Sequence, residues 1–185
     1  DMKSNEIIDI SNMKSVSCSV SKGSMALGFA STATGQHSFT TGQYTQATGY
    51  NAVAMGNVSV ASGDYSAAMG CAPHATGRSS IAFGDTTRAG GGQAFAVGHK
   101  SNASGLNSTA MGYGCSAEGI ASFVEGSGNT VYGNYSVAMG KDCSAGGISS
   151  FAEGDSNIAS GNYSVAMGEE CSAQGEHSFA IGEEC

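Results

Sequence analysis

Short runs in which small and larger side chains alternate fill most of this chain and recur at a fixed spacing. Typical runs are "SMALG" at residues 24–28 and "SVAMG" at 136–140 and 164–168. Serine and alanine take every second position, and the positions between them hold valine, methionine or leucine. A period of two is typical of β-strands, since successive side chains point to opposite faces. The pattern therefore predicts many short strands.

Two glycine series set the spacing of these runs. Each has a period of 14 residues, the two are offset by seven, and no insertion or deletion interrupts them from residue 28 to residue 182. This predicts a β-solenoid in which each 14-residue coil contributes two strands and borrows its core from its neighbours. We interpret both series as glycines of the turns between strands. The first series is Gly28, Gly42, Gly56, Gly70, Gly84, Gly98, Gly112, Gly126, Gly140, Gly154, Gly168 and Gly182, and the second is Gly35, Gly49, Gly63, Gly77, Gly91, Gly105, Gly119, Gly133, Gly147, Gly161 and Gly175.

The small residues predict which side chains point inward. With the first glycine series as position 0 of each coil, positions 3, 5, 7, 10, 12 and 0 hold almost only Ser, Ala, Gly, Thr or Cys. We expect them to line a narrow interior. Positions 4 and 6 are mainly polar, as in Thr32 and Thr34, which predicts a solvated face. Twelve coils about 4.8 Å apart would make a rod of roughly 55 to 60 Å.

Larger apolar residues take positions 11 and 13 and point away from this interior. In water they would form an apolar stripe along the whole molecule, far larger than the few hundred Å² that a monomer normally exposes. The chain has no spare segment to cover the stripe, so the sequence predicts an obligate homo-oligomer with its hydrophobic core between subunits. The predicted subunit interface consists of Met25, Leu27, Val53, Met55, Ile81, Phe83, Phe95, Val97, Met111, Phe123, Val137, Met139, Phe151, Val165, Met167, Phe179 and Ile181.

The stretch "SMALGFASTATG" at residues 24–35, and "SVAMG" followed by a "CSAxG" half, resemble the head repeats of trimeric autotransporter adhesins of the YadA type. The resemblance covers residues 24–185. It implies a left-handed parallel β-roll, three chains side by side as a homotrimer, and a role as a rigid stalk or adhesive head. The same repeat occurs in phage and other viral fibres, which "SFVEG" at 122–126 and "SFAEG" at 150–154 resemble more closely.

Residues 24–185 are thus expected to form one repeat domain of about twelve coils, and residues 1–23 an irregular N-terminal segment. Ser17, Ser19 and Ser21 keep the small-residue register of positions 3, 5 and 7, which predicts a degenerate first coil. The residues before them, with the isoleucines at 7, 8 and 10, are expected to form a strand or cap over the open end of the solenoid.

The amino-acid composition limits the classes of partner that the chain is expected to bind. The net charge is −8 with only seven scattered lysines and arginines, which disfavours nucleic acid. No apolar stretch approaches the about 18 residues that span a bilayer, so direct membrane insertion is not expected. The four histidines do not recur with acids or a nucleophile, so we expect no catalytic site and no cofactor. The expected partners are other copies of the chain and a host-surface receptor or glycan.

The six cysteines do not form an obvious disulfide framework. Cys115, Cys143 and Cys171 lie two coils apart, so their Cα atoms are about 9 to 10 Å apart and beyond the reach of a disulfide. Cys171 and Cys185 are on adjacent coils, but a bond between in-register parallel strands requires distortion, so small buried free thiols are the favoured interpretation. Such thiols suit assembly in a reducing cytosol and favour a phage or viral fibre over an adhesin that crosses an oxidising compartment.

Two glutamates interrupt the apolar stripe at position 13. Glu125 and Glu153 each follow a phenylalanine at position 11. Two interpretations stay open: a three-fold ring of carboxylates that binds a cation, or solvated carboxylates at the edge of an interface that phenylalanine fills. The sequence as a whole predicts a trimeric fibre segment of a virion that contributes to host attachment. A bacterial cell-surface adhesin and a structural spacer without its own ligand are the alternatives.

Overall fold

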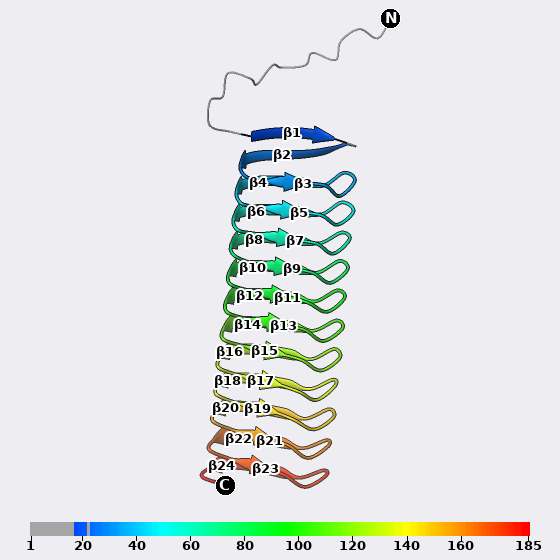
Figure 1. Ribbon diagram of the computed structural model, residues 1–185. Helices are drawn as coiled ribbons and strands as arrows, with labels where there is room; N and C mark the ends of the chain where they lie inside the picture. Colours follow the sequence, from blue (N-terminus) through cyan, green and yellow to red (C-terminus); the bar gives the residue numbers. More distant parts are fainter. Residues whose placement is uncertain (1–16, 22) are drawn as a thin grey trace, which may run out of the picture.

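The computed structural model describes residues 17–21 and 23–185. They form an all-β parallel solenoid of about eleven turns, in which each coil contributes one long and one short strand and no helix occurs (Figure 1). The predicted β-solenoid with 14-residue coils is confirmed. The number of turns is smaller than the twelve predicted, because no short strand follows the last long strand.

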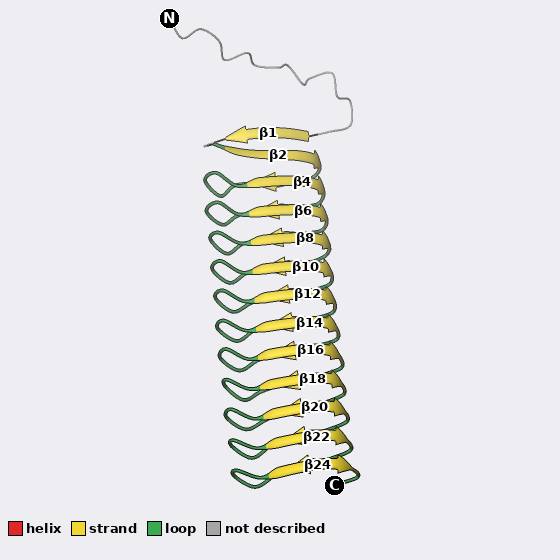
Figure 2. Ribbon diagram, turned by 180° about the vertical axis from the view of Figure 1, so that it is seen from behind, coloured by secondary structure: helices red, strands yellow, loops and turns green. Residues whose placement is uncertain are grey.

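The long strands form one 13-stranded sheet, which faces the viewer in Figure 2. The short strands form an 11-stranded sheet, which lies in front of the long strands in Figure 1. Between parallel strands of each sheet, every residue pairs with the residue 14 positions on, as Ile81 does with Phe95. The long parallel strands are β2 (Ser24–Phe29), β4 (Phe39–Gln43), β6 (Val53–Asn57), β8 (Ala67–Cys71), β10 (Ile81–Asp85), β12 (Phe95–His99), β14 (Thr109–Tyr113), β16 (Phe123–Ser127), β18 (Val137–Lys141), β20 (Phe151–Asp155), β22 (Val165–Glu169) and β24 (Phe179–Glu183). The short strands are β3 (Thr32–Ala33), β5 (Gln46–Ala47), β7 (Val60–Ala61), β9 (His74–Ala75), β11 (Arg88–Ala89), β13 (Asn102–Ala103), β15 (Ser116–Ala117), β17 (Thr130–Val131), β19 (Ser144–Ala145), β21 (Ile158–Ala159) and β23 (Ser172–Ala173).

The first strand, β1 (Ser17–Ser21), corrects the predicted degenerate coil. It pairs antiparallel with β2, with Ser21 opposite Ser24 and Ser17 opposite Gly28. Only two residues separate the strands, which is enough for a hairpin but not for a parallel crossover, and the alternation of small residues carries no information about strand direction. The cap predicted around the isoleucines at 7, 8 and 10 lies outside the described residues.

The interior consists of columns of small residues, as positions 3, 5, 7, 10 and 12 predict. Alanine at positions 5 and 12 is fully buried in most coils, and the largest apolar side chains in this core are Val124 and Val131. Position 0 differs from the prediction. Its glycines are partly exposed, and they are the fourth residues of the long strands β4 to β24 rather than parts of a turn, so their description as turn glycines is corrected. The second series lies at the bends that follow the short strands.

Contact between neighbouring coils explains why glycine is needed in both series. A Cβ on Gly84 would collide with the backbone of Gly98, and a Cβ on Gly91 would collide with the carbonyl oxygen of Gly105. Gly84 also has a φ of 123°, a conformation that other residues rarely adopt. The coils therefore approach too closely at these columns for any side chain.

Buried side chains at position 3 bind the backbone of the next coil. The Ser59 hydroxyl donates to the carbonyl of Gly70, 3.1 Å away, and lies 2.7 Å from the carbonyl of Met55. The hydroxyl of Ser101 and the thiol of Cys115 donate in the same way to Gly112 and Gly126. The hydroxyl or thiol at position 3 in these coils thus donates a buried hydrogen bond to the carbonyl of the position-0 glycine in the next coil.

Adjacent glycines allow a direct test of the close approach. We expect Gly91→Ala to prevent folding or to lower the denaturation midpoint strongly, because its methyl group would overlap the Gly105 carbonyl. Gly90→Ala is the matched control, because its nearest neighbours would be 3.9 and 4.0 Å away. Circular dichroism during urea unfolding measures both; equal midpoints would contradict the proposed constraint.

The position-3 hydrogen bonds predict opposite effects at two equivalent sites. Ser59→Ala should lower the free energy of unfolding by about 1 to 2 kcal/mol, since the Gly70 carbonyl loses the buried hydroxyl that donates to it. Thr87→Val should be neutral or stabilising, since the buried Thr87 hydroxyl has no hydrogen-bond partner among the described residues. Urea unfolding at one protein concentration compares the two variants. A larger loss from the Thr87 substitution would refute the role of position 3.

Candidate interaction surfaces

The outer side of the long-strand sheet carries every residue of the predicted subunit interface. These side chains alternate along most of the strands with buried alanines and are partly exposed in the single chain. Met25 and Met69 are 39% and 36% exposed, and Phe179 on the terminal strand is 69% exposed. Thr41 and Thr109 also lie on this face. The structure therefore contains the apolar stripe, with polar interruptions, and leaves it uncovered by the rest of the described chain.

Glu125 and Glu153 lie within this stripe. In the register of the sheet, Glu125 lies between Met111 and Met139, and Glu153 lies between Met139 and Met167. Neither carboxylate forms an ion pair with a described residue. Within one chain the two carboxylates are two coils apart, so their mutual arrangement does not form a cation site.

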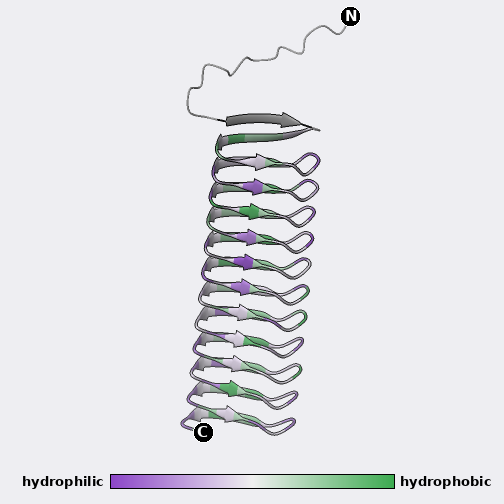
Figure 3. Cartoon of the chain, viewed as in Figure 1, coloured by the Kyte–Doolittle hydropathy of each residue, from purple (hydrophilic) through white to green (hydrophobic). Residues whose placement is uncertain are grey.

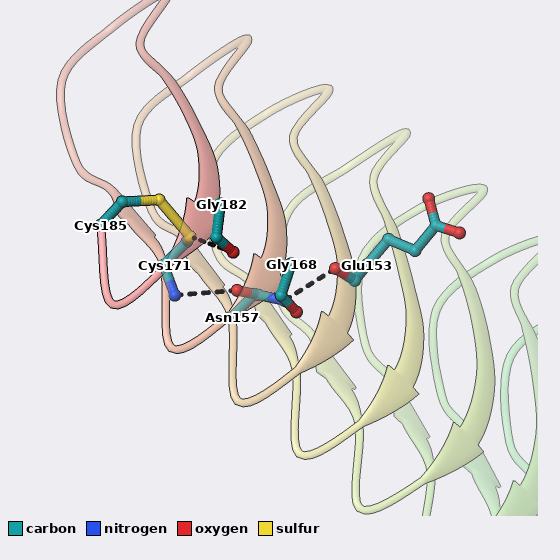
Figure 4. The surroundings of a disulfide bond; sticks show 6 residues. All are labelled: Glu153, Asn157, Gly168, Cys171, Gly182 and Cys185. Carbon is teal, nitrogen blue, oxygen red and sulfur yellow. Dashed lines mark hydrogen bonds between the residues drawn. A yellow bond between two sulfur atoms is a disulfide. The ribbon is translucent and has the colours of Figure 1, made fainter.

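Two buried asparagines accompany these glutamates and were not recognised in the sequence. Asn157 takes position 3, donates from Nδ2 to the carbonyls of Glu153 (2.7 Å) and Gly168 (2.6 Å), and accepts the Cys171 amide on Oδ1 at 2.9 Å (Figure 4). Asn129 forms the corresponding bonds with Glu125, Gly140 and Cys143. Asparagine occurs at position 3 only in the two coils that directly follow a glutamate at position 13, and that coincidence was the available signal.

The cysteine prediction needs one correction. Cys171 and Cys185 form a disulfide, with Cα atoms 4.4 Å apart (Figure 4), because the coils are close enough at the end of the solenoid to bring adjacent rungs within bonding distance. The Cys171 sulfur lies 3.3 Å from the Gly182 carbonyl but has no proton to donate in the disulfide. Cys115 and Cys143 are buried free thiols, as expected, and Cys71 is an exposed free thiol.

Polar and aromatic ladders follow the two edges between the sheets. On one edge Asp85 contacts His99 at 3.1 Å, His99 stacks on Tyr113, and Lys141 pairs with Asp155 at 3.1 Å. On the other edge Tyr50 and Tyr65 form an edge-to-face pair, and Arg78 lies over the Tyr65 ring. All of these groups are at least partly exposed and contribute little to stability, but they leave side chains of varied chemistry available to a partner.

The part of the chain that the structure describes contains no group of three or more His, Cys, Asp and Glu side chains arranged to hold a metal ion. The same residues include no helix of the length and apolarity needed to cross a membrane.

A comparison with models of protein families identifies the repeat. The model of the YadA head domain repeat matches residues 21–44, 47–70, 75–99, 89–114, 145–170 and 159–183, which together make up more than half of the chain. The chain belongs to the YadA head repeat family. Residues 115–144 are not matched, yet they continue the same two sheets without a change of register. The YadA head repeat is a structural adhesin domain rather than an enzyme. No match was found among curated proteins.

The thiols differ in exposure, which predicts selective alkylation. Burial raises the pKa of Cys115 and Cys143, so less of the reactive thiolate is present on them at pH 8. We expect iodoacetamide to modify Cys71 quickly and the two buried thiols only after denaturation, as read by peptide mass spectrometry. Because the folded chain favours the protonated form of Cys115 and Cys143, these thiols contribute to the free energy of unfolding below the ordinary thiol pKa of 9.0. That contribution is lost as the pH rises through their raised pKa values. Equal alkylation of all three in the native chain would contradict their burial.

Proposed function

We propose that the chain is a segment of a surface fibre in which three copies pack side by side through their long-strand faces. The observation that carries the proposal is the uncovered apolar stripe on the 13-stranded sheet. An alanine-sized interior buries little apolar area in each coil, whereas the valine, methionine and phenylalanine side chains outside it bury far more once a neighbour covers them. Three-fold assembly and left-handed winding follow from the resemblance to the YadA repeat.

In this proposal the fibre displays the short-strand sheet and both edges to the surroundings and attaches to a host surface through a receptor or glycan. The short-strand sheet is mainly polar on its outer side, as Gln46, Arg88 and Asn102 illustrate (Figure 3). A solvated face of this kind is compatible with the outside of a rod. The division of the two faces into apolar and polar supports a single orientation of each chain in the assembly.

Two settings fit a fibre of this family. The buried free thiols Cys115 and Cys143 favour assembly in a reducing cytosol and hence a phage or viral fibre. The disulfide between Cys171 and Cys185 favours an oxidising setting and hence a bacterial cell-surface head. We propose the virion fibre in preference to the bacterial head. The two thiols deep in the solenoid must remain reduced during folding, whereas the disulfide at the last coil can form after assembly.

Light scattering after size exclusion tests the assembly. We expect a particle of three times the 18.4 kDa of one chain. Val137→Asp combined with Val165→Asp should shift the population to monomers or to aggregates, because two carboxylates would be buried in the apolar interface. The control pair Ser144→Asp and Ser172→Asp adds the same charge on the outer side of the short-strand sheet and should leave the mass unchanged. A stable, soluble monomer of the unmodified chain would refute the proposal.

A further inference from the structure

A groove of about 460 Å³ lies where the short-strand sheet meets the turn that precedes it. Two columns of residues border it. Ala72, Thr86 and Lys100 occupy position 2 of three successive coils, and His74, Arg88 and Asn102 occupy position 4 of the same coils, with Arg88 paired in register to both of its neighbours. Residues at position 3 between the columns, such as Thr87 and Ser101, are buried, so their backbone forms the floor.

The groove brings together two of the few positively charged side chains of the chain. Residues 23–185 contain four lysines and arginines, and two of them, Arg88 and Lys100, border this groove. Both are exposed, and neither forms an ion pair with a described residue. The nearest acid along the chain, Asp85, is engaged with His99 at 3.1 Å. Two cations on adjacent rungs without acidic partners form an anion-binding arrangement.

The other groups around the groove suit a sugar. Thr86 offers a hydroxyl. Asn102 is partly exposed, and its Nδ2 donates one N–H to Ser116 Oγ at 3.4 Å, which leaves the second N–H for a ligand hydroxyl. Ala72 adds a small apolar surface. The volume exceeds that of a bare anion and lies in the range of small-molecule sites. Figure 3 shows β9, β11 and β13 as three successive hydrophilic strands on this face.

We propose that this groove binds an acidic saccharide, a sugar that carries a carboxylate or a sulfate, with Arg88 and Lys100 holding the acidic group and Thr86 and Asn102 contacting ring hydroxyls. A long polyanion is disfavoured, because ten of the fifteen acidic residues of the chain lie after residue 117 and would repel it. The inference rests on the proposed function in one respect, since it requires that the short-strand face stay outside the assembly.

Titration calorimetry with the whole chain tests the site with four probes: sialyllactose, sulfated lactose, lactose and sodium sulfate. We expect at least one of the two acidic sugars to bind about tenfold or more tightly than both lactose and sulfate. Arg88→Gln combined with Lys100→Gln should weaken that binding by about tenfold or more. Arg78→Gln combined with Lys141→Gln removes the same charge elsewhere and should change it less than about twofold.

Several outcomes would overturn the proposal. An equal loss in both double variants would indicate general charge attraction. Binding of sodium sulfate as tight as that of the acidic sugars would indicate a simple anion site, and equally tight binding of a hexaglutamate peptide would indicate an acidic peptide site. Thermal unfolding and light scattering of each variant show whether it stays folded and assembled. A trimer that binds no acidic sugar would refute this inference alone, whereas a monomer would refute the proposed fibre.

Discussion

The close approach of backbone to backbone at the two glycine columns is the constraint on which the rest of the molecule depends. Except in the last coil, a Cβ on a glycine of these columns would overlap the carbonyl oxygen of the glycine one coil further on, as a Cβ on Gly91 would overlap that of Gly105. The coil therefore has a fixed length of 14 residues, since an inserted residue would move a side chain into one of these contacts. The parallel register of both sheets follows directly.

Such tight coils leave an interior that holds alanine, serine and cysteine but little more. Buried polar side chains at position 3 are tolerated there because they bind the backbone. The Ser59 hydroxyl donates to a carbonyl, whereas Asn129 donates to two carbonyls and also accepts the Cys143 amide. The larger apolar side chains are excluded from this space and occupy the outer side of the long strands. A single roll thus has a small core and an uncovered apolar face, and the same geometric cause accounts for both.

The two faces of the solenoid are therefore suited to different tasks. The long-strand face is mainly apolar along its whole length, which favours contact with further copies of the chain. The outward residues of the short-strand face vary from coil to coil. Variation of that kind allows a local feature, such as the cations beside β11 and β13, without cost to the fold. A repeat protein can in this way keep a rigid scaffold and still differ along its length.

The sequence by itself determined the coil length, the solenoid, the two strands per coil and the outward direction of the apolar residues, because each of these follows from periodicity. It did not determine the direction of β1, since alternating small residues look alike in parallel and antiparallel strands. Nor could it distinguish glycines of a turn from glycines inside a strand, or show that Cys171 and Cys185 lie within bonding distance. The grouping of Lys100 with Arg88 and His74 around one groove also required the tertiary structure, because the spacing along the chain does not show which surface residues border a hollow.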